Sequence, residues 1–218
     1  MNKLANESLL TRIRDKHFAD YQDLGPRERI LLASLKLFVE QGYFNTNIPD
    51  LSRESKCSVG SIYHHYRNKE EVATALYETG LAAFRHALSD KVLSSTGPEQ
   101  LFKEIVHFFL SFSEEYEYLA RYMWLSRHSE FMSGQFLHGK ISHPTMIGFD
   151  PLGRRLTIAI KAAIRDGQIR SLKANIIWSV LFGIPLSYVR DWLDGYNLEP
   201  PSQVADTLAE TCWLALQA

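Results

Sequence analysis

Hydrophobic residues recur at helical spacing along nearly the whole chain, whereas the alternation typical of β-strands is scarce. The first clear helix is predicted to begin at Pro26, because a proline in the first helical turn loses no intrahelical hydrogen bond. An apolar stripe runs through this helix from Ile30 to Phe38. Gly42 is predicted to end it, because glycine readily takes the left-handed backbone of a helix C-terminus.

Residues 45–67 read as two short helices joined by a tight turn. Asn47 is predicted to cap the first of them, which buries Leu51, and Ser58 is predicted to cap the second. Ile62 and Tyr66 are the inward positions of the second helix. Two short helices in this order form a helix-turn-helix, whose second helix enters the major groove of DNA.

Further apolar stripes predict helices along the rest of the chain, which gives an all-α fold of about nine helices. These helices are expected at about 69–93, from 98 onward, at 119–125, 152–164, 172–193 and 200–216. Pro185 is expected to kink the helix over 172–193, because it cannot donate to the carbonyl of Leu181. Residues 132–150 read as a loop. Residues 1–24 form a partly patterned extension, which is either flexible or packed on a partner.

Composition narrows the class of protein without naming it. Hydrophobic residues make up 45% and charged residues 22% of 218 residues, and the net charge is −1. This is ordinary globular composition. Between Arg27 and Lys69 there are seven Lys or Arg against four acids, a local excess compatible with phosphate contact.

The distribution of other residue types excludes several classes. Cys57 and Cys212 form no metal-binding or disulfide pattern, and no signal-peptide core or membrane-length apolar run is visible, so a cytoplasmic protein without a membrane span is expected. No catalytic motif is apparent, and we expect neither an enzyme nor a cofactor. His128, His138 and His143 have spacing too irregular to favour a metal site.

Small and polar residues at the start of the second short helix suit contact with DNA. Ser58, Gly60 and Ser61 allow close approach of the backbone, and Val59 can touch a thymine methyl group. Tyr63, His64 and Lys69 offer hydroxyl, imidazole and ammonium groups to phosphates, which fix register rather than sequence. Thr46 and Asn47 lie at a helix N-terminus, which is a further phosphate site. His65 is undecided between DNA and the core. Insertion of Arg12, Arg14 and Lys16 into a minor groove is the alternative for the extension.

The N-terminal segment resembles the tetracycline-repressor (TetR) family. The resemblance covers about 46 residues. It runs through Arg27-Glu28-Arg29-Ile30-Leu31, Leu37-Phe38, Gln41-Gly42-Tyr43, Thr46, Asp50-Leu51, Ser58, Gly60-Ser61-Ile62-Tyr63-His64-His65-Tyr66 and Asn68-Lys69-Glu70-Glu71-Val72. It implies a dimeric repressor that binds double-stranded DNA at an inverted-repeat operator.

Three positions depart from the family pattern. Lys56 stands at the turn position where relatives usually have glycine, and it is expected to adopt a left-handed conformation at a cost of about 1 kcal/mol. Pro49 and Val59 replace residues that are often polar in relatives. Fewer base hydrogen bonds are therefore expected, and two alternatives stay open: a helical protein-interaction module with vestigial DNA binding, and a transcriptional activator.

The resemblance divides the chain into an extension (1–24), a DNA-binding domain (25–72) and a helical domain (73–218) that binds a small-molecule effector and dimerises. Aromatic residues and a few polar ones on the middle helices predict an apolar or aromatic effector. The pocket candidates are His107, Phe108, Phe112, Arg121, Tyr122, Trp124, His128, Trp178 and Phe182. The last two helices carry the candidates for a four-helix dimer interface, with burial inside one subunit as the alternative. These candidates are Ile177, Leu181, Leu186, Val204, Leu208 and Leu216.

Overall fold

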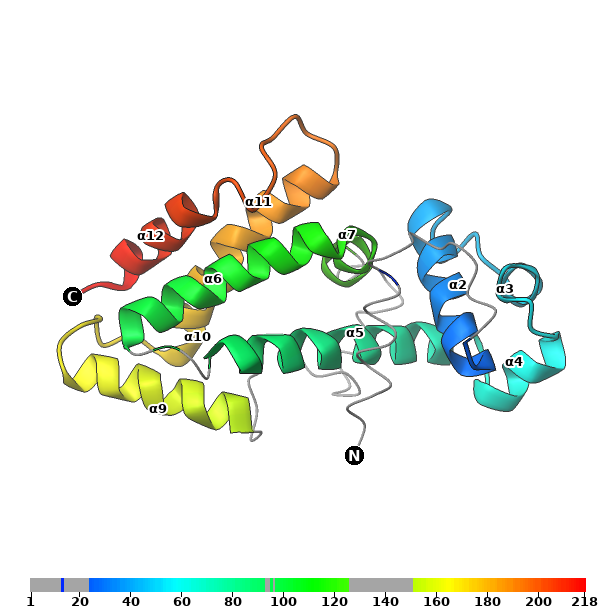
Figure 1. Ribbon diagram of the computed structural model, residues 1–218, viewed down its shortest axis with the longest axis horizontal. Coiled ribbons are helices and arrows are strands. Elements are labelled where there is room, and N and C mark those ends of the chain that lie inside the picture. Colours follow the sequence, from blue (N-terminus) through cyan, green and yellow to red (C-terminus); the bar gives the residue numbers. More distant parts are fainter. Residues whose placement is uncertain (1–12, 14–23, 93–94, 96, 126–150) are drawn as a thin grey trace. The chain divides into compact units, whose positions relative to one another are not determined.

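The described chain is helical almost throughout. The computed structural model describes residues 13, 24–92, 95, 97–125 and 151–218 (Figure 1). Its helices are α2 (Pro26–Glu40), α3 (Ile48–Ser55), α4 (Val59–His65), α5 (Lys69–Val92), α6 (Pro98–Glu115), α7 (Glu117–Ala120), η1 (Arg121–Leu125), α9 (Pro151–Arg165), α10 (Ala174–Trp178), η3 (Ser179–Gly183), α11 (Ile184–Leu193) and α12 (Ala205–Leu216). Extended pairing within these described ranges is limited to one antiparallel bridge between Ile169 and Gln217. The predicted all-α class is confirmed.

Some predictions fall on other parts of the chain. The loop at 132–150, the three histidines 128, 138 and 143, and the basic residues of the N-terminal extension lie outside the described residues. Among the helices that are described, none combines the length and apolar character needed to cross a membrane.

The chain divides into two compact units, and α5 runs from one into the other. The first unit takes the described residues up to Ala83 together with 116–125, and the second takes Phe84–Glu115 and the residues from Pro151 onward. α7 and η1 belong to the first unit because they pack on α2.

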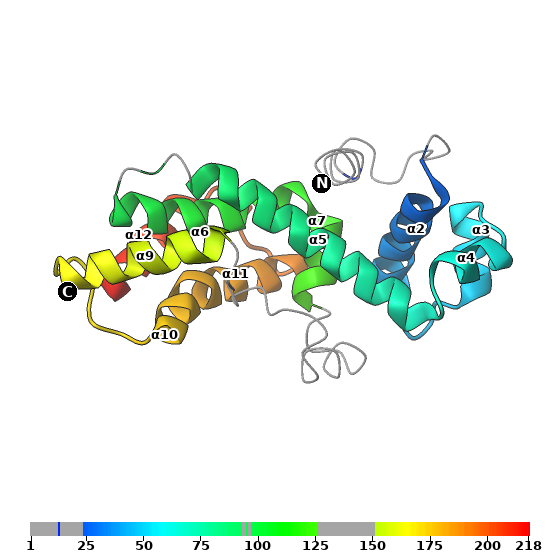
Figure 2. The ribbon, with the colours of Figure 1, turned by 90° about the horizontal axis from the view of Figure 1, so that it is seen from below.

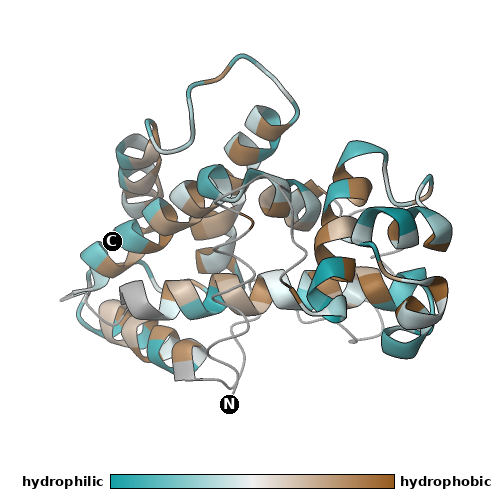
Figure 3. Cartoon of the chain, turned by 45° about the vertical axis from the view of Figure 1, so that its right-hand side comes forward, coloured by the Kyte–Doolittle hydropathy of each residue, from teal (hydrophilic) through white to brown (hydrophobic). Residues whose placement is uncertain are grey.

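The first unit is built around α2, which packs against α3 and α4 (Figure 1). Ile30, Leu35, Leu51 and Ile62 are fully buried between these helices. Figure 3 shows hydrophobic and hydrophilic stretches alternating along the helices, as expected where each helix has one buried face. The π-helical segment η1 adds Tyr122, whose ring stacks on Phe38 at 6.0 Å.

The second unit is organised around α6, which packs most extensively against α12 and also meets α11 and α9 (Figure 2). The ring of Phe102 on α6 lies 6.1 Å from that of Trp213 on α12. At the edge of the same contact, Lys103 Nζ pairs with Glu99 at 2.6 Å and with Glu210 at 2.5 Å.

Two predicted helices begin later than expected, and a π-helical turn stands where a kink at Pro185 was predicted. The helix expected from Leu172 begins at Ala174, and the last helix begins at Ala205 rather than at Pro200. Before Pro185 the structure has the π-helical turn η3. A proline lacks the N–H that the preceding turn needs, which explains why the regular pattern breaks there.

Candidate nucleic-acid interface

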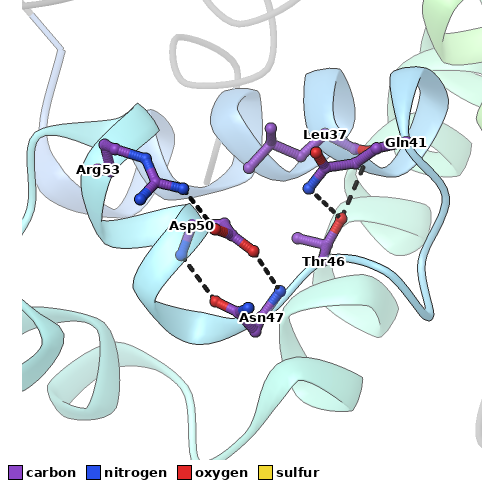
Figure 4. Close-up of polar contacts among 6 residues, drawn as sticks. All are labelled: Leu37, Gln41, Thr46, Asn47, Asp50 and Arg53. Carbon is purple, nitrogen blue, oxygen red and sulfur yellow. Dashed lines mark hydrogen bonds and ion pairs between the residues drawn. The ribbon is translucent and has the colours of Figure 1, made fainter.

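α3 is fixed at its N-terminus by a complete capping box (Figure 4). The Asp50 amide donates to Asn47 Oδ1 at 3.0 Å, and the Asn47 amide donates to Asp50 Oδ2 at 3.1 Å. Asp50 also pairs with Arg53 at 2.5 Å. Pro49 lies in the first turn, where its missing N–H leaves no bond unmade. The predicted cap is confirmed, and the proline does not disturb the helix.

The turn between α3 and α4 uses a left-handed lysine. Lys56 has φ 55° and ψ 29°, and among the described residues it is the one non-glycine with positive φ. The expectation drawn from its sequence position is confirmed. Ser52 Oγ donates to the Cys57 carbonyl at 2.6 Å, which closes the turn from α3. The buried Cys57 side chain anchors it to the core.

α4 presents one face to the core and leaves the other exposed. Ser58 caps it, accepting from the Ser61 amide at 3.1 Å. Ile62 and Tyr66 are buried, as predicted. The exposed residues of α4 are Val59, Gly60, Tyr63, His64 and His65, and Ser61 is half-buried. Tyr63 has 53% of its surface exposed. His65, undecided from the sequence, lies on the exposed side with its ring 5.2 Å from that of His64.

Thr46 occupies a structural position rather than the phosphate-binding position predicted for it. It is 1% exposed. Its hydroxyl donates to the Gly42 carbonyl at 2.9 Å. The same hydroxyl accepts from Gln41 Nε2 at 3.2 Å and lies 3.4 Å from the Leu37 carbonyl, which ties the turn to the end of α2 (Figure 4). Asn47 is exposed, but its side chain is committed to the capping box. The functional groups of both residues are used within the domain.

Lys69 is also held by the protein itself. Its Nζ donates to the carbonyls of Tyr43 and Thr46, each at 2.6 Å, and lies 4.2 Å from the centre of the Tyr43 ring. Burial lowers the pKa of Lys69 from its usual value. Asn68 caps α5 by accepting from the Glu71 amide at 2.8 Å, while Glu71 accepts from the Arg67 amide at 2.6 Å.

Three basic residues that were not predicted to contact DNA are exposed in the structure. Arg53, Lys56 and Arg67 are exposed in the same segment as α4. Their charge excess was visible in the sequence, but which of them face outward depends on the packing of α3 and α4 on α2. Phe44, in the turn before α3, is 67% exposed.

The predicted effector residues divide between the two units. Arg121, Tyr122 and Trp124 belong to the first, where the Tyr122 hydroxyl donates to the Ala73 carbonyl at 2.8 Å and Arg121 pairs with Glu117 at 3.1 Å. The remaining described candidates, all in the second unit, are His107, Phe108, Phe112, Trp178 and Phe182.

Within the second unit these candidates sit in different surroundings. The rings of Phe108 and Phe112 lie 5.2 and 5.0 Å from that of Phe84. Trp178 and Phe182 have ring centres 5.8 Å apart. His107 Nε2 lies 3.1 Å from Asp206 at the exposed edge of α6 and α12.

Three of the predicted dimer residues are fully buried inside a single chain. These are Ile177, Leu181 and Leu216. Burial within one subunit, the alternative to a dimer contact, explains why these three positions are apolar. Leu186, Val204 and Leu208 are half-buried. The exposed apolar residues of these helices are others: Leu214 at 58%, Ile176 at 44% and Ile184 at 37%.

A capped pair of short helices on a third, with the second helix exposed, defines the helix-turn-helix class of DNA-binding domain. Residues 30–76 match the family described as "Bacterial regulatory proteins, tetR family". This segment is therefore a domain of the tetR family, and the resemblance seen in the sequence is confirmed.

Curated relatives match part of the chain. The HTH-type transcriptional regulator HbdR of Aromatoleum sp. (strain CIB) is 32% identical over 72 residues, which are 33% of this chain and 31% of the relative. The HTH-type transcriptional repressor NicS of Pseudomonas putida is 30% identical over 82 residues, 38% of this chain and 39% of the relative. The chain thus spans about a third of the length of these relatives. Both are named as regulators, which agrees with the prediction that the chain is not an enzyme.

Solved structures share the fold over most of the chain. A TetR family transcription regulator from Marinobacter aquaeolei VT8 has a TM-score of 0.71 and 17% identity, covering 88% of this chain and 95% of the other. The transcriptional regulator FadR from Bacillus subtilis, in complex with stearoyl-CoA, has a TM-score of 0.70 and 15% identity, covering 87% and 98%. The predicted architecture, a helix-turn-helix domain followed by a helical domain, is confirmed.

Proposed function

We propose that the protein is a transcriptional regulator that binds an inverted-repeat operator as a homodimer and releases it when a small apolar or aromatic effector binds. One observation carries this proposal: α4 is anchored by the buried Ile62 and Tyr66 while its opposite side is exposed. A helix presented in this way fits the major groove, which is about 12 Å wide. The proposed site of action is the bacterial cytoplasm, where the DNA lies.

The exposed residues of α4 favour close approach over base hydrogen bonding. Val59 offers an apolar contact to a thymine methyl group, and Gly60 leaves room for the backbone to approach the DNA. Tyr63 and His64 offer donors to phosphates. In a two-fold dimer the two copies of α4 read half-sites about 34–36 Å apart or at multiples of that distance.

The effector is proposed to bind among the helices of the second unit, which are rich in aromatic side chains. FadR, with the same fold, binds stearoyl-CoA. A long-chain acyl-CoA is therefore the first probe to test, beside smaller aromatic compounds. α5 follows the helix-turn-helix in the chain and continues into the second unit. A displacement of α5 is therefore the simplest way for effector binding to change DNA binding. A hundredfold loss of DNA affinity requires about 2.8 kcal/mol of coupling.

Selection of bound fragments from random double-stranded DNA tests the proposal. We expect enrichment of an inverted repeat by the native protein. The matched control is Gly60→Glu, since a side chain at Gly60 meets nothing closer than Ser58 Oγ at 3.9 Å. This variant should fold normally and lose the enrichment by repelling phosphates. Absence of any enriched sequence with the native protein would reject DNA recognition and favour the protein-interaction module.

Two observations support DNA recognition over the alternative of a protein-interaction module with vestigial DNA binding. Pro49 sits in a helix whose capping box is intact, and Lys56 completes the turn in a left-handed conformation. Neither departure from the family pattern breaks the helix-turn-helix. Activation on the same fold is the remaining alternative. Transcription in vitro from the selected operator, placed over and then upstream of a promoter, separates it from repression by the sign of the effect.

A further inference from the structure

The helix proposed to enter the major groove carries no lysine or arginine of its own. The residues of α4 are small, apolar, aromatic or histidine, and Val59 stands where relatives often have a polar residue. DNA carries one phosphate charge for about every 1.7 Å of its axis, and proteins neutralise these charges with lysine and arginine. The cations that hold α4 against the phosphates must therefore come from residues outside the helix.

Two exposed cations flank α4 closely. Lys56 lies two residues before the N-cap, Ser58, and Arg67 directly follows the C-cap, Tyr66. Within the described part of the chain, neither side chain is engaged in a hydrogen bond or an ion pair. At about 1.5 Å per residue the seven residues of α4 are roughly 10 Å long, close to the width of the groove. Long side chains at the two ends of this helix can therefore reach phosphates that border the groove.

Other basic side chains of the same domain are at least partly used within it. Lys36 pairs with Glu54 at 2.8 Å, and Arg53 pairs with Asp50 at 2.5 Å. Lys69 donates two of its three N–H groups to carbonyls and keeps the third for a phosphate. The two cations beside α4 differ from these because their charged groups are wholly available.

Lys56 carries its charge on a backbone conformation that favours glycine. Its φ is 55°, a value that strains a residue with a β-carbon. Both neighbours are fixed, since the buried Ser55 donates to the Leu51 carbonyl at 2.5 Å and Ser52 donates to the Cys57 carbonyl at 2.6 Å. Strain of this kind persists where the surrounding structure enforces it, and it gathers at functional positions. A lysine here, where glycine would remove the strain, indicates that the side chain has a use.

We infer that Lys56 and Arg67 are phosphate contacts that flank α4, and that Lys56 gains DNA affinity at the expense of backbone stability. The inference rests on the proposed function and extends it to a position where relatives usually have glycine. Contacts of this kind fix the position of α4 on the duplex and strengthen binding to every sequence alike. The alternative for Lys56 is a structural role, because a cation at the C-terminal end of α3 also stabilises the helix dipole.

The salt dependence of binding to a duplex of mixed sequence tests both contacts, since phosphate contacts do not require the operator. Lys56→Gln and Arg67→Gln remove a charge, whereas Lys56→Arg and Arg67→Lys keep it. Each lost contact lowers the slope of log affinity against log salt by about 0.9, or about 1.8 for a dimer bound through both heads. We expect this loss in the two glutamine variants and the native slope in the two that keep the charge. Lys161→Gln is the matched control with a native slope, because Lys161 is an exposed lysine of α9 in the second unit.

Lys56→Gly supplies a second readout with two opposite effects. Removal of the strain should raise the urea concentration at which the protein unfolds, while the salt slope falls as in Lys56→Gln. A lysine that served only the dipole of α3 would leave the salt slope native in both variants. Greater stability together with a reduced slope therefore distinguishes a phosphate contact from a structural role.

Reduced slopes in the glutamine variants, with native slopes in Lys56→Arg, Arg67→Lys and Lys161→Gln, would support the inference. Native slopes in Lys56→Gln and Arg67→Gln, with duplex binding by the native protein intact, would overturn it and leave the proposed function standing. An equal loss in Lys161→Gln would also overturn it, because the effect would then reflect net charge alone. Failure of the native protein to bind any duplex would reject the inference and the proposed function together.

Discussion

At the scale of single residues, the helix-turn-helix uses similar side chains for opposite purposes. Thr46 and Tyr63 both carry a hydroxyl in the segment predicted to contact DNA, yet Thr46 is buried and bonded to the end of α2, while Tyr63 is half exposed. A buried hydroxyl needs a partner inside the protein, because leaving it unbonded is costly. For these two hydroxyls, exposure therefore distinguishes the one that holds the motif together from the one available to DNA.

Lys56→Gly should stabilise the protein. A left-handed residue with a β-carbon costs about 1 kcal/mol or more, and glycine removes that strain while losing some of the gain to chain entropy. We expect a net gain of about 0.5 kcal/mol in the free energy of unfolding, measured in urea. Lys56→Ala keeps the β-carbon and should show no gain. A less stable glycine variant would contradict the strain argument.

Tyr63→Phe should weaken binding to all duplexes alike. The hydroxyl is exposed and proposed to bond to a phosphate, and one such bond is worth about 1 kcal/mol, or roughly fivefold in affinity. Fluorescence anisotropy with the operator and with a scrambled duplex measures both losses. The melting temperature should not change. A loss confined to the operator would instead assign Tyr63 to base recognition.

At the scale of the element, capping side chains and glycine determine where the N-terminal helices begin and end. α3 starts after Asn47 and α4 after Ser58, each capped by its own side chain, and Gly42 follows the end of α2 with φ 89°. α5 contains a glycine for a different reason. A β-carbon at Gly80 would lie 2.8 Å from both Leu119 Cδ1 and Met123 Sδ.

Gly80→Ala and Gly183→Ala should therefore have opposite effects. At Gly80 the added methyl group overpacks a buried contact at a cost of about 1–3 kcal/mol, against a gain in helix propensity of about 1 kcal/mol. At Gly183 nothing lies within 4 Å, so only the gain applies. Thermal unfolding should show a lower midpoint for the first variant and a higher one for the second. Equal effects would mean that Leu119 and Met123 move aside without cost.

At the scale of the whole molecule, the apolar residues left exposed on the last helices are those available to a second copy. Leu214, Ile176 and Ile184 are exposed on α12, α10 and α11. Their neighbours Ile177, Leu181 and Leu216 are buried in the core of one chain. A dimer interface on these helices therefore depends on Leu214, Ile176 and Ile184 and on the half-buried residues beside them.

Leu214→Glu should dissociate the proposed dimer into monomers. A charge placed in an apolar interface is left without a partner, and its desolvation opposes association. Light scattering after size exclusion should report a mass near the 25.0 kDa of one chain. Ile158→Glu is the matched control, since Ile158 is 68% exposed but lies on α9. Equal dissociation by both variants, or by neither, would place the interface elsewhere.

Prediction from sequence succeeded for the helix-turn-helix and was weaker beyond it. The caps at Asn47 and Ser58, the left-handed Lys56 and the buried Ile62 all followed from residues within a few positions of one another. Val204 and Leu208 were predicted to belong to the same interface as Ile177, Leu181 and Leu216, yet the first two are half-buried and the other three are fully buried in one chain. Periodicity marks the apolar face of a helix, but not how much of that face a neighbouring helix of the same chain covers.

By itself the sequence determined the helical class, the boundaries of the N-terminal helices and the family of residues 30–76, because capping, proline and glycine effects act over three or four residues. The tertiary structure alone decided that Thr46 is buried and that Lys69 is bonded to a turn more than twenty residues earlier. It also decided which leucines and isoleucines remain exposed. These outcomes depend on groups far apart in the chain, whose hydrogen bonds and contacts exist only after the helices have packed.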